Sequence, residues 1–372
     1  MVKIGVVGAS GFVGNRAVEM LHAGDTEVRA IGRSPASFER LTRQDLDCRV
    51  ANAFDRSELE AAFRGCDVVI HSILGSPGLI KGSITPTYQA AEKAGVRRIL
   101  YLSSMIVHRP APAPGTTEAS PLVKNQPYPA HPAKIAAERH LLRLRKNGSV
   151  EVAIFRPGIV FGPRSRWITD LANQLTSGTA YLINGGKGIC NSVYIDNLIH
   201  ALGLAIVAPG ADGEAFFVGD RECVTWFDFY RPFAEAFGID PAQIPQLTAP
   251  EFTQSWKQRL KSSLWDSEIV QKMLALMSDD FKQSLKQAIP KRGKQPPAPA
   301  QDSVPRQPVV TQMMAELQQS QYKLPFTKAE QILGYEPIVS FSEGCRRSIK
   351  WLAESEGFAA IKPIVNHPDL PD

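Results

Sequence analysis

Three glycines near the start of the chain have the spacing of a loop that binds phosphate groups. Gly8, Gly11 and Gly14 follow a short apolar run, residues 2–7, and precede a segment with helical periodicity. Residues without side chains let the backbone approach a pyrophosphate, and the next helix offers free N–H donors and the positive end of its dipole. The spacing is GxxGxxG instead of the usual GxGxxG. We predict a dinucleotide site built from these glycines and the residues between them, Ser10, Phe12 and Val13.

The end of the second predicted strand indicates which dinucleotide is bound. An acidic residue at this point accepts hydrogen bonds from the ribose hydroxyls and repels a 2′-phosphate. Gly32 stands there instead, followed by Arg33 and Ser34. An arginine paired with the 2′-phosphate, at about 1.5–3 kcal/mol, would favour NADP over NAD roughly 10- to 150-fold. We therefore expect NADP, with NAD as second choice, although Arg33 as a solvated surface residue remains an alternative.

These residues lie on a chain in which strands alternate with helices. Apolar, strand-like runs occupy residues 2–7, 27–31, 67–72, 98–103, 150–156 and 214–218, with helical patterns at 57–63, 87–94 and within 193–208. Alternation of this kind is typical of right-handed βαβ units and a parallel sheet. We predict an α/β fold: a Rossmann-type doubly wound parallel sheet with a smaller, mostly helical C-terminal substrate domain.

The same pattern predicts two interleaved domains. Residues 1–164 plus 189–222 form the predicted NAD(P)-binding Rossmann domain, and residues 165–188 plus 223–372 the substrate or cap domain. The cap is expected to contain a helical insert, 249–289, and a proline-rich tether, 290–310. The insert is interpreted as part of a cap core, with a lid, a partner-binding helix and a membrane-surface contact as alternatives. A second proline-rich stretch, residues 108–132, is expected to be a long functional loop.

Several motifs resemble one known family. They are the glycine loop, DVVIH (67–71), the serine pair 103–104, RPGIVFGP (156–163), VYIDN (193–197) and LGYEP (333–337). With them the chain resembles the extended branch of the short-chain dehydrogenase/reductase superfamily, the NAD(P)-dependent epimerase/dehydratase group. The resemblance covers most of residues 1–240 and 322–352, and the proline-rich insert lies outside it.

The resemblance implies catalysis by a serine, a tyrosine and a lysine. The tyrosine exchanges a proton with the substrate oxygen, and the lysine holds the cofactor ribose and lowers the tyrosine pKa. Alignment places the serine at Ser104, whose alternative role is to cap a backbone amide, and the lysine at Lys134. The tyrosine is expected four residues before the lysine, where this chain has Ala130.

Two nearby residues are candidates for the missing acid/base group. Tyr128, in a Tyr-Pro pair, could replace the motif tyrosine if the entry to the helix is irregular, which Pro129 and Pro132 favour. On a regular helix, residues six apart lie on different faces, so Tyr128 would not meet Lys134. His131 is a further candidate because of its near-neutral pKa, although exposure to solvent is its simpler interpretation.

Other positions expected around the cofactor also depart from the family pattern. Ile73 and Leu74 replace the small residues expected after the fourth strand, and their bulk could tighten or block the nucleotide site. Pro157 is expected beside the cofactor. Asn52 and Ala53 are expected at the adenine, where the Asn52 amide can both donate and accept.

Asp55 is expected to cap the helix that follows, with Glu58 completing a capping box.

Composition excludes several other classes of protein. The 372 residues carry 42 Lys/Arg and 37 Asp/Glu, a net charge of +5, which argues against a nucleic-acid binder. The five cysteines are widely spaced without a CxxC pair, so a reducing compartment and no metal site are expected. No run of 18 or more apolar residues occurs, so no transmembrane segment and a cytoplasmic location are expected.

Two functions follow as hypotheses. The first is an NAD(P)-dependent oxidoreductase or epimerase that acts on a hydroxyl or carbonyl group of a small molecule, either a nucleotide sugar or an apolar steroid- or isoprenoid-like substrate. The second is a dinucleotide-binding scaffold, sensor or assembly factor with a degenerate catalytic site. A homodimer through helices around 87–94 and 134–146 is possible.

Overall fold

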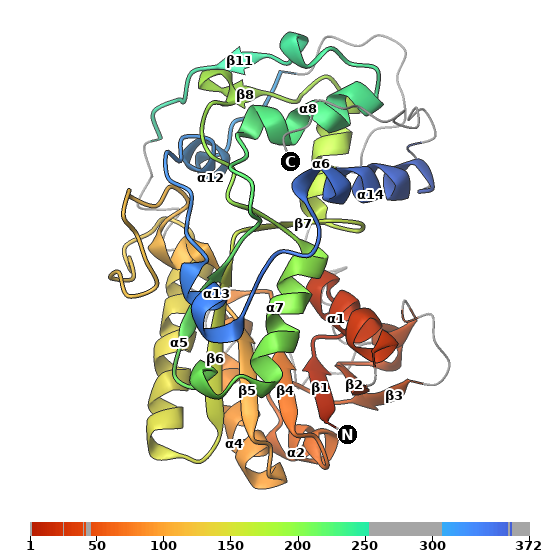
Figure 1. Cartoon of the computed structure of the whole chain (residues 1–372), viewed down its shortest axis with the longest axis vertical. Coiled ribbons are helices and arrows are strands. Elements are labelled where there is room, and N and C mark those ends of the chain that lie inside the picture. Colours follow the sequence, from red (N-terminus) through yellow and green to blue (C-terminus); the bar gives the residue numbers. More distant parts are fainter. Residues whose placement is uncertain are drawn as a thin grey trace, which may run out of the picture.

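A seven-stranded parallel sheet forms the centre of the N-terminal part of the protein (Figure 1). The computed structural model describes residues 2–24, 26–39, 41, 46–252, 307–355 and 358. The strands lie in the order β10-β6-β5-β4-β1-β2-β3. Their bounds are β1 Lys3–Val7, β2 Glu27–Gly32, β3 Asp47–Val50, β4 Val68–His71, β5 Arg98–Leu102, β6 Glu151–Pro157 and β10 Ala215–Val218. The predicted Rossmann-type sheet is therefore confirmed.

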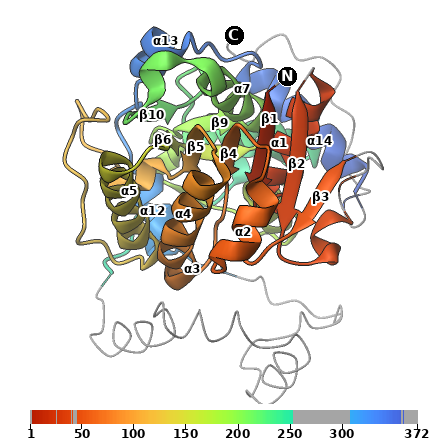
Figure 2. The same ribbon diagram turned by 90° about the horizontal axis from the view of Figure 1, so that it is seen from below.

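Helices cover both faces of this sheet because its strands are apolar on both sides. Ile4 and Val6 of β1 pack into one core, with helices α1 (Phe12–Ala23) and α7 (Ile195–Val207). Val7 belongs to the other core, under α2 (Arg56–Phe63), α4 (Ile84–Ala94) and α5 (Ala130–Asn147). Figure 2 shows these three helices side by side, with the short α3 (Pro77–Gly82) at their end. Burial on both faces is what a parallel sheet requires.

The predicted strands end within two residues of the observed ones, and two local features differ from the sequence patterns. The edge strand β3 has no strand-like residue pattern, because its residues Asp47-Cys48-Arg49-Val50 are mostly polar and exposed, and only the strand numbering of the family resemblance implied it. Helix α5 begins at Ala130, inside the loop expected to extend to Pro132. Pro132 is the third residue of the helix, where a missing N–H costs no intrahelical hydrogen bond.

The C-terminal part is mostly helical and packs around an aromatic core. The rings of Phe229 and Phe341 lie 5.5 and 5.6 Å from that of Phe161. Its helices are α6 Arg166–Thr176, α8 Trp226–Ala236, α12 Gln312–Leu317 and α14 Phe341–Ala353, whereas α13 (Thr327–Leu333) returns to the sheet and packs against β10 and α7. Two small parallel pairs complete it, β7 (Ile159–Phe161) with β9 (Ser192–Tyr194) and β8 (Leu182–Ile183) with β11 (Gln246–Leu247).

The predicted insert and tether fall almost entirely on residues 253–306, outside the described residues. Within the described ranges, no helix is both long and apolar enough to cross a membrane.

Candidate active site

The turn between β1 and α1 forms a cradle with a free helix N-terminus. Gly8 has φ +87°, and its carbonyl accepts the N–H of Gly11 at 2.9 Å. Gly11 is the N-cap of α1, so no side chain caps the helix, and its first turn holds no acidic residue. The N–H groups and the positive end of α1 are thus left for an anion. β1 lies between β4 and β2, the point at which the strand order reverses and at which such folds bind ligands.

Gly14 lets α1 pack directly against this turn. A Cβ at this position would lie 2.2 Å from the Gly8 carbonyl oxygen and 2.7 Å from Ser72 Oγ. Ser72 in turn donates to the Val7 carbonyl at 2.8 Å. The cradle is therefore close-packed, and two of the three predicted glycines have different roles. Gly8 allows the backbone conformation of the turn, and Gly14 allows α1 to pack against it.

The end of β2 has no space for an acidic side chain. A Cβ on Gly32 would lie 2.5 Å from Cβ of Ser37, in the short helical turn η1 (Pro35–Phe38). Ser34 caps that turn and exchanges hydrogen bonds with Ser37. Arg33 is exposed and, among the described residues, pairs with no carboxylate. An exposed arginine and a glycine that admits no acidic side chain thus lie together at the end of β2.

The predicted adenine contacts belong to the turn before α2. Asn52 Oδ1 accepts the N–H of Phe54 at 3.1 Å, and Ala53 is half-buried within the same turn. Asp55 caps α2 as predicted, accepting the N–H groups of Ser57 and Glu58. The predicted capping box is wrong, because the Glu58 carboxylate accepts the Asn52 N–H at 2.7 Å and so fixes the turn instead.

The residues after β4 and β6 differ in exposure. Leu74 is 75% exposed and projects into solvent, whereas Ile73 is half-buried against the second core. Of the two, only Ile73 is held by packing at the end of β4. Pro157 ends β6 and is buried, opposite Val218 of β10.

Lys134 is buried at the carboxyl end of β5. Its ammonium donates to the carbonyls of Leu102 and Ser103, at 3.1 and 3.2 Å. Burial lowers the pKa of this amine to about 8, although the negative charge of Glu138 acts in the other direction and raises it. Ser103 Oγ is buried without a hydrogen-bond partner among the described residues, and Ser104 Oγ accepts the Ile106 N–H at 3.4 Å. Ser104 thus has the capping role foreseen as its alternative, and its hydroxyl proton is still available.

Tyr128 lies beside His131, just before the start of α5. Its ring is 4.7 Å from that of His131, and its hydroxyl is buried with no hydrogen bond of normal geometry in the described part of the chain. Burial and the nearby negative charge of Glu316, on α12, raise the pKa of this phenol. α5 begins at Ala130, so Tyr128 precedes the helix, and no hydrogen bond joins its hydroxyl to Lys134 in the described part of the chain. The phenol therefore stays protonated at neutral pH.

His131 is buried instead of solvent-exposed. Its Nδ1 lies 2.8 Å from Gln126 Oε1. Burial and, to a smaller extent, the positive charge of Lys134 lower the pKa of the ring to about 4. The ring is therefore neutral at pH 7.

A buried ion pair holds α5 against β6, and the residue patterns alone gave no sign of it. Arg156 donates to Glu138 through Nε at 3.2 Å and Nη2 at 2.7 Å, and through Nη1 to His108 Nε2 at 3.1 Å. Both partners are almost completely buried. Since its guanidinium is satisfied within the protein, the arginine of the RPG motif positions α5 and the loop before it.

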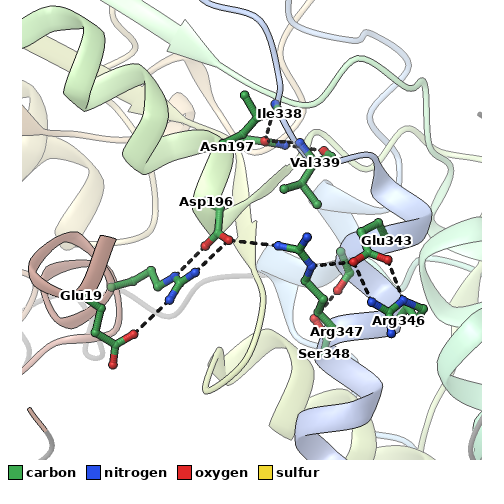
Figure 3. A network of polar contacts seen from close by, with 11 residues as sticks. Glu19, Asp196, Asn197, Ile338, Val339, Glu343, Arg346, Arg347 and Ser348 are labelled. Carbon is green, nitrogen blue, oxygen red and sulfur yellow. Dashed lines mark hydrogen bonds and ion pairs between the residues drawn. The ribbon is translucent and has the colours of Figure 1, made fainter. Parts of the chain in front are cut away.

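The VYIDN motif joins the two parts of the chain (Figure 3). Asp196 accepts from Arg16 of α1 at 2.6 Å and from Arg347 of α14 at 3.3 Å. Asn197 Oδ1 accepts the N–H groups of Ile338 and Val339, both at 2.9 Å. These residues fix the C-terminal segment beside the sheet.

No group of three or more His, Cys, Asp or Glu in the described ranges could hold a metal ion.

Comparison with known proteins agrees with this geometry. Residues 4–219, more than half of the chain, match the model of the NAD dependent epimerase/dehydratase family. The chain is 26% identical over 259 residues to a 3 beta-hydroxysteroid dehydrogenase/Delta 5-->4-isomerase of Mycobacterium tuberculosis, covering 63% of this chain and 70% of that protein. It is 24% identical to a 3-diazoavenalumate denitrifying reductase of a Streptomyces species, over 67% of this chain and 86% of that one. The fold is shared with dTDP-glucose 4,6-dehydratase of Streptomyces venezuelae, solved with NAD bound, at TM-score 0.67 and 19% identity, covering 96% and 98% of the two chains.

Proposed function

Because the chain belongs to the NAD-dependent epimerase/dehydratase family, within the extended short-chain dehydrogenases/reductases, we propose that it is a reductase or dehydrogenase that uses NADP(H) on an apolar carbonyl or hydroxyl compound. The chain is an enzyme of a family that comprises NAD-dependent epimerases, dehydratases and dehydrogenases. The observation that carries the proposal is the cradle at the point where the strand order reverses, with the buried Lys134 amine two strands away, at the carboxyl end of β5.

The residues present fit a dinucleotide. The Gly8–Gly14 turn would hold a pyrophosphate against the N–H groups of α1, whose N-terminus has no side-chain cap. Gly32 and Arg33, which pairs with no carboxylate among the described residues, favour a 2′-phosphate, so NADP is proposed over NAD. When bound, the cofactor supplies or accepts the hydride.

The chain's own residues then bind and protonate the substrate oxygen. The Ser104 hydroxyl donates a hydrogen bond to that oxygen, and the protonated Tyr128 phenol supplies the proton during reduction. Lys134 holds the cofactor ribose from its place at the end of β5. Ser10, Phe12, Val13, Ser34, Asn52, Ala53, Ile73 and Pro157 are the further contacts proposed for the cofactor.

An apolar substrate of the steroid or isoprenoid type is proposed over a nucleotide sugar. Support comes from the Tyr128-Pro129 pair and from relatives that include a hydroxysteroid dehydrogenase. Arg156 lies in the RPG motif, but its charge is neutralised by Glu138, so it offers no site for a substrate diphosphate.

The test is Tyr128→Phe, assayed with a 3β-hydroxysteroid and NADP⁺ and, in parallel, with UDP-glucose. We expect kcat to fall by at least about 100-fold, the contribution typical of general acid–base catalysis, with NADPH affinity unchanged. Unchanged turnover would exclude Tyr128 as the proton donor. Turnover of UDP-glucose alone would replace the apolar substrate by a nucleotide sugar.

A scaffold or sensor that binds a dinucleotide without turnover is the second candidate, because Ala130 stands where the motif tyrosine is expected and, among the described residues, no hydrogen bond joins Tyr128 to Lys134. The variant Ala130→Tyr restores the motif spacing to Lys134. A gain of cofactor-dependent activity in a chain otherwise inactive would favour this candidate, whereas a loss of existing activity would favour a native site built around Tyr128.

A further inference from the structure

One amide side chain joins the three segments that carry the candidate site. Ser104 precedes the short helical turn η2 (Met105–His108), Tyr128 lies in the loop that follows, and Lys134 lies on α5. The amide of Gln126 is hydrogen-bonded to η2, to the loop and to α5. The relative positions of the three site residues therefore depend on a residue that belongs to none of the motifs.

The hydrogen bonds of Gln126 identify the nitrogen and the oxygen of its amide. Its Nε2 donates to the carbonyls of Ile106 and Val123, at 2.9 and 2.8 Å. Carbonyl oxygens only accept, so this end must be the NH₂ group, whose two protons match the two acceptors. The other end is therefore the amide oxygen, which lies 2.8 Å from Nδ1 of His131.

The orientation of this amide determines the tautomer of His131. An amide oxygen has no proton to give, so Nδ1 of the ring must carry a hydrogen and donate it to Gln126. The ring is neutral, because burial and the positive charge of Lys134 hold its pKa at about 4. A neutral imidazole carries one proton, so Nε2 is an acceptor only. His131 is thus fixed in one orientation and one protonation state.

The ring of His131 in turn supports the ring of Tyr128. The two ring centroids lie 4.7 Å apart at an angle of 44°, and the backbone N–H of His131 donates to the Tyr128 carbonyl at 3.0 Å. The phenol hydroxyl is buried and makes no hydrogen bond of normal geometry with the described residues. Contact between the rings, and no hydrogen bond of its own, therefore sets the direction of the phenol.

We propose that Gln126 is a positioning residue: it fixes His131 as the Nδ1–H tautomer, and the His131 ring holds the Tyr128 phenol where it can donate to a substrate oxygen. The inference rests on the proposed function for its catalytic part. It accounts for a tyrosine that acts outside the motif spacing and without a hydrogen bond to Lys134. A displacement of about 1 Å can lower a rate roughly 100-fold, so a residue that acts only through its neighbours can limit turnover.

The first test is NMR of the imidazole nitrogens in the full ¹⁵N-labelled chain, with His131→Gln to assign the signals. We expect the Nδ1–H tautomer at neutral pH. In Gln126→Glu, the carboxylate beside Nδ1 favours the charged ring, so the pKa of His131 should rise by about 1 to 3. An Nε2–H ring in the wild type, or an unchanged His131 titration in Gln126→Glu, would overturn the proposal.

The second test measures turnover of a 3β-hydroxysteroid with NADP⁺ in Gln126→Met, whose side chain has a similar length but makes none of the three hydrogen bonds. We expect kcat to fall about 10- to 100-fold, with KM and the affinity for NADPH within about twofold of the wild type, because the residues of the cradle are unchanged. Asn125→Leu, at the exposed amide next in the chain, is the matched control and should keep kcat within about twofold.

Tyr128→Phe separates a failure of this inference from a failure of the proposed function. A loss of turnover in both Tyr128→Phe and Gln126→Met supports the positioning role. A loss in Tyr128→Phe alone would overturn that role and leave the proposed function intact. Full turnover in Tyr128→Phe would overturn the proposed function, and the positioning role with it.

Discussion

Replacing Gly14 by alanine should damage both the stability of the sheet and the binding of the dinucleotide. The new Cβ would stand 2.2 Å from the Gly8 carbonyl oxygen, and real Cβ contacts are essentially never below 3.0 Å. The Gly8 backbone cannot rotate away as a side chain would, so α1 must move outward by about 0.8 Å. Overpacking against backbone costs up to about 3 kcal/mol, and the better helix propensity of alanine returns about 1 kcal/mol. We expect a net loss of about 2 kcal/mol in the free energy of unfolding.

Gly11→Ala is the matched control that separates packing from ligand approach. Gly11 has φ −76° and ψ 164°, which alanine adopts without strain, and its Cβ would meet only the Gly8 carbonyl, at 3.3 Å. Alanine is a poorer N-cap than glycine and its contact with the Gly8 carbonyl is tight, so the free energy of unfolding should fall by up to about 1 kcal/mol, less than for Gly14→Ala. The methyl group nevertheless stands where a pyrophosphate approaches, so NADPH affinity should fall about 10- to 150-fold.

Urea unfolding followed by tryptophan fluorescence and NADPH titration calorimetry measure the two effects. Gly14→Ala should lower both the free energy of unfolding and the affinity for NADPH. Gly11→Ala should act mainly on the affinity for NADPH. A Gly14→Ala protein as stable as the wild type would show that α1 is not packed as described, and unchanged NADPH affinity in Gly11→Ala would show that no pyrophosphate lies at this turn.

Two further outcomes are expected. Arg33→Ala should reduce the preference for NADPH over NADH by roughly 10- to 150-fold, measured as the ratio of the two dissociation constants, because the 2′-phosphate loses its cation; an unchanged ratio would make Arg33 a surface residue only. Complete burial lowers the pKa of His71 to about 4 from 6.5, so the unfolded chain binds more protons between these values, and stability should fall by up to about 3 kcal/mol as pH drops from 6.5 to 4. Urea unfolding across this range should show a shallower decline in His71→Asn, and an identical decline would mean that His71 is already charged in the folded protein.

Local sequence was sufficient where one segment determines its own structure. The glycine turn, the apolar strands and the N-cap at Asp55 are set by residues within a few positions of one another, and all are found as predicted. The residue patterns missed β3 because its residues Asp47-Cys48-Arg49-Val50 carry almost no apolar signal, and only pairing with β2 makes them a strand.

The candidate site shows more clearly what local sequence could not predict. The family resemblance predicts Ser104 and Lys134 as site residues, but it does not give the surroundings of the Tyr128 phenol. Tyr128 precedes α5, its ring lies beside His131, and Glu316, almost 200 residues away, lies near its hydroxyl.

The sequence by itself determined the parallel sheet, the phosphate cradle and the family, because periodicity, glycine spacing and motifs are local properties of the chain. The tertiary structure decided which charges pair with one another. Arg156 and Glu138 neutralise each other, and Arg16 and Arg347 converge on Asp196. Such pairings join residues up to 180 positions apart, and no local pattern specifies them, since they depend on how the two parts of the chain pack together.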